Sequence, residues 1–355
     1  ANPPADPFEL AYHFDAAGEY AQALPYALVA AERARQQFAL ETAEHNYRIA
    51  ERGAAGADPG IRFRISAGFG DVLMLRGRYD AAQQQLALAQ SLAYDRLEQA
   101  RTLAKLGELA FRRGNVDEGN AAMEQALRLL GRFVPRSSAA LTVAALWEAG
   151  IQAGHTLLPK LWLARRPLDK SEEDLLAVHI YSRLAYNYWY LRGRMAVIWA
   201  HLRDLNIAER YPPTPELAQA YSEHSPAMTT LPWFRRANAY AEKSLAMRRQ
   251  MGDVWGQGQT LHFYALALYA ESRFEESIEK CREAVRLLDR TGDRWEVNNA
   301  TFNTIMCLYR QGKLKEALEA SQRLHGEALA IGDRYAVRLA LEAWGKTSGG
   351  RIPRG

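Results

Sequence analysis

The chain has 355 residues, of which 48% are hydrophobic and 24% are charged, and its formal net charge is +4. This composition is ordinary for a soluble globular chain. The length excludes a single compact core, a limit that does not apply to repeat proteins. The positive charge is small and mixed with acidic residues along the chain, so it gives no case for nucleic acid as a partner.

The first 131 residues predict helices joined by short turns. Apolar residues at helical spacing predict three helices within residues 8–53 and two helix pairs within residues 61–131. The turns begin at glycines: Gly18, Gly77 and Gly114. We interpret residues 1–131 as an N-terminal group of helical repeats.

Residues 132–170 interrupt this regular pattern, and three prolines punctuate them: Pro135, Pro159 and Pro167. Residues 139–163 are mostly apolar, which raises the alternative of a membrane span. Glu148 and Lys160 interrupt that run, and no clean stretch of about 20 apolar residues remains. We therefore expect a buried or interface helix followed by a basic loop, in the least regular part of the array.

Residues 171–345 repeat with a period close to 40. The dipeptide Gly-Asp begins at residues 252, 292 and 332, in steps of 40, and each copy is followed two residues later by an aromatic residue. These aromatic residues are Trp255, Trp295 and Tyr335. A fixed period of this size indicates a solenoid built from one supersecondary unit. We expect residues 346–355 to form a linker or tail.

One unit shows the physical basis of the repeat. Apolar side chains at helical spacing predict a helix over residues 294–311 and a second helix from Leu314 onward. Gly312 and Gly332 end these helices, because glycine adopts the left-handed conformation without steric cost. Asp333 then caps the next helix by accepting its first N–H groups. Neither helix can bury its apolar stripe alone, so neighbouring units must stack.

The turn between paired helices has the form Gly-x-aromatic/apolar-x-x-small. This pattern resembles the inter-helix turn of the tetratricopeptide repeat (TPR), whose usual period is about 34 residues. The resemblance implies an all-α, TPR-like α-solenoid: a right-handed superhelix of antiparallel helix pairs with repeats of about 40 residues. HEAT repeats, with a period near 40, are the alternative. We favour TPR because the turn recurs along most of the chain.

Longer stretches resemble one kind of TPR protein. Residues 9–23 read Glu-Leu-Ala-Tyr-His-Phe-x-x-Ala-Gly-Glu-Tyr-x-x-Ala. They resemble the start of the TPR region in large bacterial signalling ATPases of the STAND (AAA) type, and the Gly-Asp junctions resemble the sensor region of the maltose-regulator-like subgroup. Residues 130–136, 208–222 and 256–262 resemble TPR segments of multidomain kinases and nucleotide cyclases of that kind. The resemblance covers nearly the whole chain.

The resemblance implies a cytoplasmic bacterial regulator whose attached ATPase, kinase or cyclase domains lie outside this sequence. The phosphate-loop pattern Gly-x-x-x-x-Gly-Lys-Ser/Thr is absent. Both ends of the chain read as cut linkers, so we expect a fragment of a larger protein. Cys281 and Cys307 lie within apolar helical patterns, and we interpret them as buried thiols in a reducing compartment.

The sequence contains no convincing catalytic pattern. None of its eight histidines belongs to a His-Glu-x-x-His motif or a Cys/His cluster. A Gly-x-Ser-x-Gly elbow is also missing. Gly256-x-Gly258 lacks the rest of a dinucleotide fingerprint. The sequence therefore predicts a non-enzymatic chain that holds no metal and no cofactor.

The candidate binding surface is the concave groove lined by the first helix of each pair. Counting back from each turn places these residues there: Arg183, Asn187, Tyr190, Gln219, Ser222, His262, Tyr269, Asn299, Phe302 and Tyr309. Aromatic rings supply contact area and amides supply directional hydrogen bonds, which suits a small polar effector or an extended peptide. The alternative for each aromatic residue is that it fills space between helices.

We therefore expect a non-catalytic protein-interaction or effector-sensing module that regulates attached signalling domains. Its partner would be a protein or peptide segment, or a small effector, bound in the groove. Two alternatives stay open: a self-association scaffold with residues 139–163 as its contact, and a HEAT-like adaptor for a peptide segment. The missing catalytic residues argue against an enzyme domain.

Overall fold

The computed structural model describes residues 6–349, apart from the side chains of Lys170 and Tyr190. Within these residues the chain consists of α-helices, two short 3-10 helices and connecting turns, with no β-strand. The prediction of an all-α chain is confirmed for the part of the sequence that the structure describes.

The helices follow the expected pairing. The N-terminal group contains α1 (Pro7–Ala16), α2 (Tyr20–Gln36), α3 (Leu40–Gly53), η1 (Ala54–Gly56), α4 (Pro59–Leu75), α5 (Tyr79–Leu92), α6 (Arg96–Arg112) and α7 (Val116–Leu129). The middle segment contains α8 (Ser138–Leu157), α9 (Pro159–Trp162) and η2 (Leu168–Lys170). The C-terminal group contains α10 (Glu172–Leu191), α11 (Arg194–Ala208), α12 (Pro215–Thr229), α13 (Phe234–Met251), α14 (Val254–Ala270), α15 (Phe274–Thr291), α16 (Arg294–Arg310), α17 (Leu314–Ile331) and α18 (Arg334–Thr347). Helix α18 thus extends two residues into the predicted tail, and residues 350–355 lie outside the described part.

The Gly-Asp junctions end one helix and begin the next, as predicted. The glycines have left-handed backbone, with φ of 68° at Gly252, 77° at Gly292 and 70° at Gly332. The following aspartates accept a hydrogen bond from the backbone N–H three residues further on: Asp253, Asp293 and Asp333. Each junction therefore supplies both a C-cap and an N-cap.

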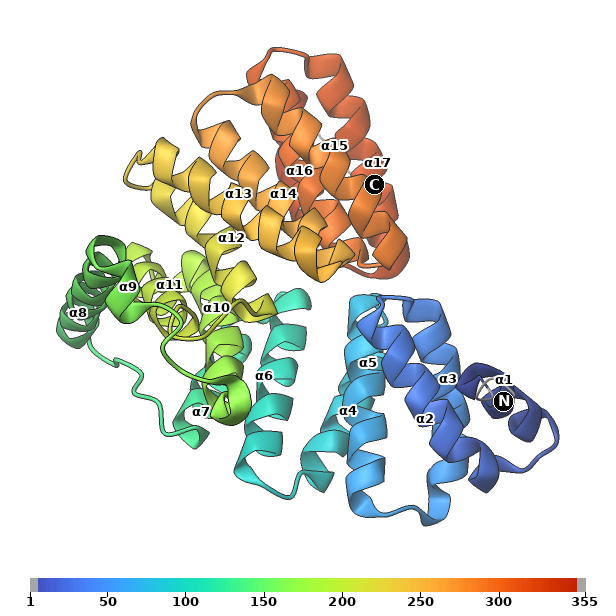
Figure 1. Ribbon diagram of the computed structural model, residues 1–355. Helices are drawn as coiled ribbons and strands as arrows, with labels where there is room; N and C mark the ends of the chain where they lie inside the picture. The colour runs from blue at the N-terminus through green and yellow to red at the C-terminus, as the bar shows by residue number, and fades with distance from the viewer. Residues whose placement is uncertain (1–5, 350–355) are drawn as a thin grey trace.

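The helix pairs stack side by side in two layers (Figure 1). Helices α2, α4, α6, α10, α12, α14, α16 and α18 contact one another in this order, and we call them the inner layer. The odd-numbered partners cover this layer, and the apolar core lies between the two. Side chains on the inner layer can therefore contact side chains of other repeats, whereas the outer helices mainly cover the core.

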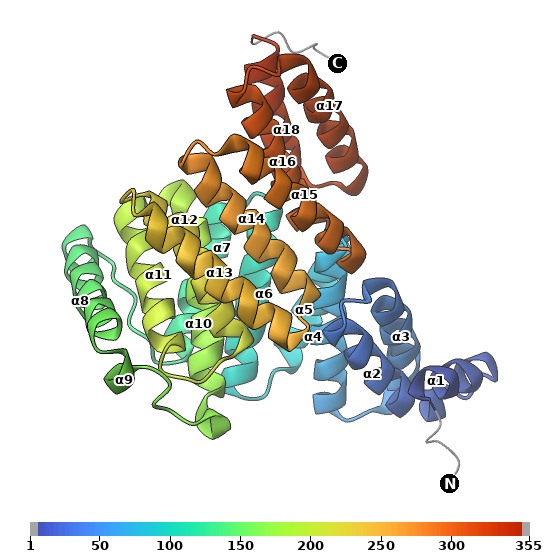
Figure 2. The ribbon, with the colours of Figure 1, turned by 45° about the horizontal axis from the view of Figure 1, so that its top comes forward.

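Helix α8 departs from this scheme. It packs mainly on α11 and α9 and lies at the edge of the molecule in both views (Figures 1 and 2). The residues on either side of α8 and α9 contain little helix, and regular pairing resumes at α10. None of the helices between residues 6 and 349 is long and apolar enough to cross a bilayer.

Candidate functional site

The inner layer brings the N-terminal helices against the Gly-Asp junctions of the C-terminal group (Figure 1). Phe38, in the turn between α2 and α3, stacks on Trp255 of α14, with ring centroids 5.5 Å apart and an interplanar angle of 3°. A Cβ atom on Gly77, in the turn between α4 and α5, would lie 3.8 Å from Cβ of Ile331 at the end of α17. We call this set of contacts between the two groups the closure.

Four aromatic residues, each from a different helix, form the centre of the closure: Phe111 of α6, Tyr186 of α10, Trp295 of α16 and Tyr335 of α18. The ring centroids of Phe111 and Tyr186 lie 5.6 Å apart, as do those of Trp295 and Tyr335. The hydroxyl oxygens of Tyr186 and Tyr335 are 3.3 Å apart. Phe111, Trp295 and Tyr335 are buried. Helices far apart in the sequence thus share one small apolar cluster.

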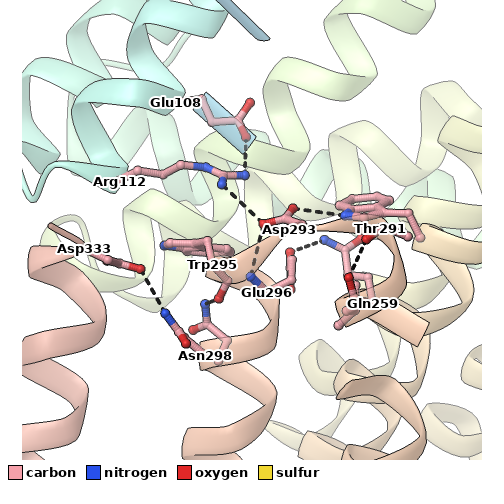
Figure 3. A network of polar contacts seen from close by, with 12 residues as sticks. Glu108, Arg112, Gln259, Thr291, Asp293, Trp295, Glu296, Asn298 and Asp333 are labelled. Atoms are coloured by element: carbon pink, nitrogen blue, oxygen red, sulfur yellow. Dashed lines mark hydrogen bonds and ion pairs between the residues drawn. The ribbon is translucent and has the colours of Figure 1, made fainter. Parts of the chain in front are cut away.

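Arg112 of α6 adds an ionic contact to the closure (Figure 3). Its guanidinium donates to Glu108 Oε1 at 3.0 Å and lies 3.6 Å from Asp293 Oδ1, the N-cap of α16. The guanidinium also lies 4.9 Å from the ring centroid of Trp295. Asp293 in turn accepts the indole N–H of Trp255 at 3.0 Å. The aspartate that caps α16 is therefore also the residue on which the N-terminal group is anchored.

The ionic contacts continue toward the N-terminus. Lys105 Nζ lies 2.6 Å from Asp71 Oδ1, and Arg35 lies 3.4 Å from the other oxygen of Asp71. Burial raises the pKa of Glu108, but Lys105 and Arg112 outweigh this effect and hold it below its usual range. Glu108 therefore stays ionised, and a chain of paired charges runs from α2 to α16.

Beside the closure, consecutive inner helices carry polar atoms that have no hydrogen-bond partner among the described residues. These atoms are Arg183 Nε on α10, Ser222 Oγ and Glu223 Oε2 on α12, Gln259 Oε1 and His262 Nδ1 on α14, and Glu296 Oε2 on α16. We call this set, together with Gln219, the inner polar surface. A buried polar group without a partner costs about 1–3 kcal/mol. A bound ligand that offers donors and acceptors can satisfy such groups.

Electrostatic contacts show that these groups lie close together. His262 Nδ1 is 3.7 Å from Glu296 Oε2, which is too far for a hydrogen bond. Burial raises the pKa of Glu296, but His262, Gln259 and Arg183 outweigh it and hold that pKa below its usual range. Arg183 itself has no hydrogen bond or ion pair within residues 6–349. Its charge nevertheless acts at a distance on Glu108 and Glu296 and helps to lower the pKa of both.

The structure places four of the predicted groove residues on the inner polar surface: Arg183, Gln219, Ser222 and His262. Gln219 donates to Glu223 Oε1 at 2.6 Å and accepts from Arg248. Gln219, Ser222 and His262 are buried, whereas Arg183 is half-buried. Neighbouring helices therefore cover Gln219, Ser222 and His262 in this closed arrangement, and their role in binding stays a prediction.

Two predicted groove residues face elsewhere. Asn187 is buried against α7, with its Nδ2 3.7 Å from Met123 Sδ. Asn299 is buried and donates to the backbone oxygen of Trp295, four residues earlier on its own helix, at 2.8 Å. Asn187 is thus held against α7 of a neighbouring pair and Asn299 by its own helix, and a role for either amide in binding stays a prediction.

The remaining groove residues are aromatic. Tyr269, Phe302 and Tyr309 are half-buried and pack against the apolar cluster of α15 to α18. The hydroxyl of Tyr269 accepts from Arg310 Nε at 2.9 Å. The side chain of Tyr190, on α10, lies outside the part that the structure describes.

Sequence reasoning did not select Arg112, Asp293 or Trp295 as site residues. The signal was present, since an aromatic residue follows each Gly-Asp junction two positions on. That pattern reveals a repeat, but repeat periodicity carries no information about which distant helix packs on the junction. The closure could only be found in three dimensions.

A group of three potential metal ligands lies between α11 and α12. One ligand atom each from His201, Asp204 and Glu223 lies within 4.8 Å of the others. However, His201 Nε2 is 2.9 Å from His224 Nδ1, and Arg236 Nε donates to His224 Nε2 at 2.9 Å. With neutral rings this arrangement leaves the proton of His201 on Nδ1, the atom that faces Asp204. The residues form a hydrogen-bonded relay and do not suit a metal in this tautomer.

A surface cavity of about 330 Å³ lies away from the predicted groove. It is formed by α3, α4 and α5, and its polar lining includes Arg48, Glu51 and Arg78. None of the predicted groove residues contributes to it.

No protein-family model and no curated protein matches this sequence. Several solved structures match the chain in fold. A Rap protein complexed with competence and sporulation factor is 12% identical over 94% of this chain and 84% of that chain, with a TM-score of 0.59. The STAND protein with a tetratricopeptide repeat sensor from Pyrococcus horikoshii is 11% identical over 98% of this chain and 50% of that chain, with a TM-score of 0.47. Aspartyl phosphate phosphatase F from Bacillus subtilis is 13% identical over 91% and 78%, with a TM-score of 0.43.

At these identities the likeness concerns the fold. The Rap structure carries the comparison, because its TM-score is the highest of the three. The prediction of a TPR-like α-solenoid is confirmed, and the chain shares its fold with the Rap protein. Likeness of fold does not assign an activity.

Proposed function

We propose that this chain is a non-catalytic sensing or protein-interaction module whose inner polar surface binds an extended peptide segment. The observation that carries the proposal is the run of polar atoms on α10, α12, α14 and α16 that have no hydrogen-bond partner among the described residues. Backbone N–H and C=O groups of an extended peptide alternate along its length, so they can satisfy such a run of donors and acceptors.

The charges of this surface favour a peptide with a free carboxylate. Arg183 has no ion-pair partner within the described residues, and guanidinium groups bind carboxylates through two parallel hydrogen bonds. Glu296 would accept an amide or amino group of the same ligand. The Rap protein of similar fold was solved with competence and sporulation factor, which agrees with a ligand-binding role for this architecture.

We further propose that the ligand is reported through the closure to attached ATPase, kinase or cyclase domains of a longer, cytoplasmic chain. Glu296 of the inner polar surface lies one helical turn from Asp293, which holds Arg112 of the other group. A ligand that orders the Glu296 side chain therefore also orders Asp293, the residue that contacts Arg112. Ligand binding and closure would stabilise each other, since each orders the same turn of α16.

The absence of an activity of its own is part of the proposal. Burial raises the pKa of the Cys281 thiol to about 12, so this cysteine is a poor nucleophile. Cys281 and Cys307 are buried and unpaired, which fits a reducing compartment.

The direct test is affinity selection from a random library of short peptides with free C-termini, followed by mass spectrometry. We expect the wild-type chain to enrich peptides that Arg183→Gln fails to enrich. Arg194→Gln is the matched control, because Arg194 is exposed at the start of α11. A library that yields no peptide, or peptides retained equally by both variants, contradicts the proposed site.

A further inference from the structure

Helix α8 has an inverted polarity. Its only charged residue, Glu148, points into the molecule, where its side chain accepts from Arg203 and Asn206 at 2.8 Å. His155 is also buried and lies 2.7 Å from Glu209. The opposite face is apolar and open to solvent: Val143, Leu146, Trp147 and Leu157 are 67%, 66%, 69% and 77% exposed. A surface helix normally shows the reverse pattern, so this face is built for contact.

Six of the exposed residues of α8 follow a heptad spacing, and Trp147 lies beside them. The six are Ala139, Val143, Leu146, Gly150, Ala153 and Leu157, separated alternately by four and three positions. This spacing keeps one stripe facing a neighbouring helix along its whole length. A Cβ atom on Gly150 would meet no atom of the chain within 4 Å, so the middle of the stripe is open. We call this stripe the α8 seam.

The α8 seam is complementary to itself. In an antiparallel pair centred on residue 148, Ala139 lies opposite Leu157, Val143 opposite Ala153 and Leu146 opposite Gly150. Every layer then combines a larger side chain with a smaller one, which is the condition for close packing of two helices. A lipid surface would require no such pairing of sizes.

We propose that this chain forms a two-fold symmetric dimer through antiparallel contact of the α8 seams of two copies. The same surface serves both partners, as in isologous interfaces. Leu158 and Leu161 are exposed at the end of α8 and the start of α9 and widen the apolar surface. A seam of about 30 Å, the length of a 20-residue helix, belongs to the small interfaces that bury less than about 1,200 Å² in total. The dimer therefore dissociates on dilution.

The first experiment is sedimentation velocity of the full chain over a range of concentrations. The wild-type protein shifts from monomer to dimer as concentration rises, and Leu146→Glu abolishes the shift because it places a charge in the apolar seam, opposite Gly150 of the other copy. The matched control is Leu329→Glu on α17, where the leucine is 57% exposed, and it dimerises like wild type. Melting temperatures of both variants show whether the fold is intact.

The second experiment tests the direction of the pairing by cysteine cross-linking. In the antiparallel dimer the two copies of residue 149 lie at nearly the same level, whereas the copies of residue 139 are about 27 Å apart along the helix axis. A bismaleimide with a reach of about one helix diameter, about 10 Å, therefore links Ala149→Cys but not Ala139→Cys. The native Cys281 and Cys307 are buried and do not react.

Four outcomes overturn the proposal. The wild type stays monomeric, Leu146→Glu dimerises normally, or both cysteine variants are linked, which indicates parallel helices. The fourth is a monomer that co-sediments with phosphatidylserine vesicles and loses this binding in Leu146→Glu. That result assigns the seam, with the nearby Arg165 and Arg166, to a membrane surface.

Discussion

Arg112 shows how one buried side chain can hold distant repeats together. It lies between Glu108 of its own helix and Asp293 of α16, and both its side chain and that of Asp293 are buried. Asp293 and Glu108 outweigh the effect of burial and raise the pKa of Arg112 above its usual value. Burial raises the pKa of Asp293, and Arg112 opposes this rise. Removing the arginine therefore leaves the buried Asp293 without its main counter-charge and deprives Glu108 of one of its two neighbouring cations.

Arg112→Met should lower the free energy of unfolding by about 3–5 kcal/mol, the usual cost of breaking a buried ion pair from one side. The neighbouring Arg113 is the matched control, because its partner Asp80 is 92% exposed. Arg113→Met should cost about 1 kcal/mol or less. Urea titration followed by circular dichroism measures both values, and similar small losses would show that the closure does not depend on Arg112.

We expect the buried His201 to make the free energy of unfolding depend on pH. Burial lowers its pKa to about 4, below the value of about 6.5 in the unfolded chain. The unfolded chain therefore binds more protons between these values, so the His201 contribution is fully present above about pH 6.5 and is lost as pH falls toward 4. Asp204, whose pKa is raised by burial, opposes this trend. His201→Gln should therefore reduce the slope of unfolding free energy against pH by up to about 1 kcal/mol per unit. An unchanged slope in urea titrations between pH 4 and pH 6.5 would refute this.

At the scale of the helix, the sequence predicted most of the architecture. Gly312 and the Gly-Asp junctions set the helix ends, because their requirements are local: a left-handed backbone at the glycine and a side-chain acceptor at the aspartate. The orientation of Asn187 and Asn299 could not be predicted in this way. Which face of a helix meets its partner depends on packing between helices. Residues three positions apart lie on nearly the same side of a helix, so sequence spacing alone does not show which of them the partner covers.

The junction glycines give a prediction with an internal control on one helix. Gly332 ends α17 with a φ of 70°, whereas Gly326 lies within the same helix and is exposed. Gly332→Ala should destabilise the chain by about 1–2 kcal/mol, because other residues are strained in the left-handed region. Gly326→Ala should stabilise it by about 0.5–1 kcal/mol, since alanine loses less backbone entropy. Thermal unfolding of the two variants should move in opposite directions; shifts of the same sign would contradict this account.

At the scale of the whole molecule, the closure was beyond prediction from the sequence. No sequence pattern singled out Phe38. Its φ of 54° lies in the left-handed region, in a turn where glycine is common, so its backbone is strained. Its stacking on Trp255 supplies the reason. Contacts of this kind join repeats that are remote in sequence, whereas the period of 40 reports only on neighbours.

Phe38→Gly should open the closure while relaxing its own turn, because glycine accepts positive φ without strain. We expect a larger radius of gyration in small-angle X-ray scattering. Ser272→Gly is the matched control: Ser272 has a φ of 64° in the turn between α14 and α15, away from the closure contacts. If both variants remain as compact as the wild type, the Phe38 contact does not hold the two groups together.

Hydrogen–deuterium exchange of the wild-type chain with and without a peptide recovered from the library tests the central claim most directly. The account predicts slower exchange in α12, α14 and the first turns of α16, together with the turn at Phe38 and the end of α6. Protection at the inner helices and at the closure in the same experiment would show that ligand and closure are coupled. Protection confined to the surface cavity of α3 to α5, or to the outer helices, would contradict it.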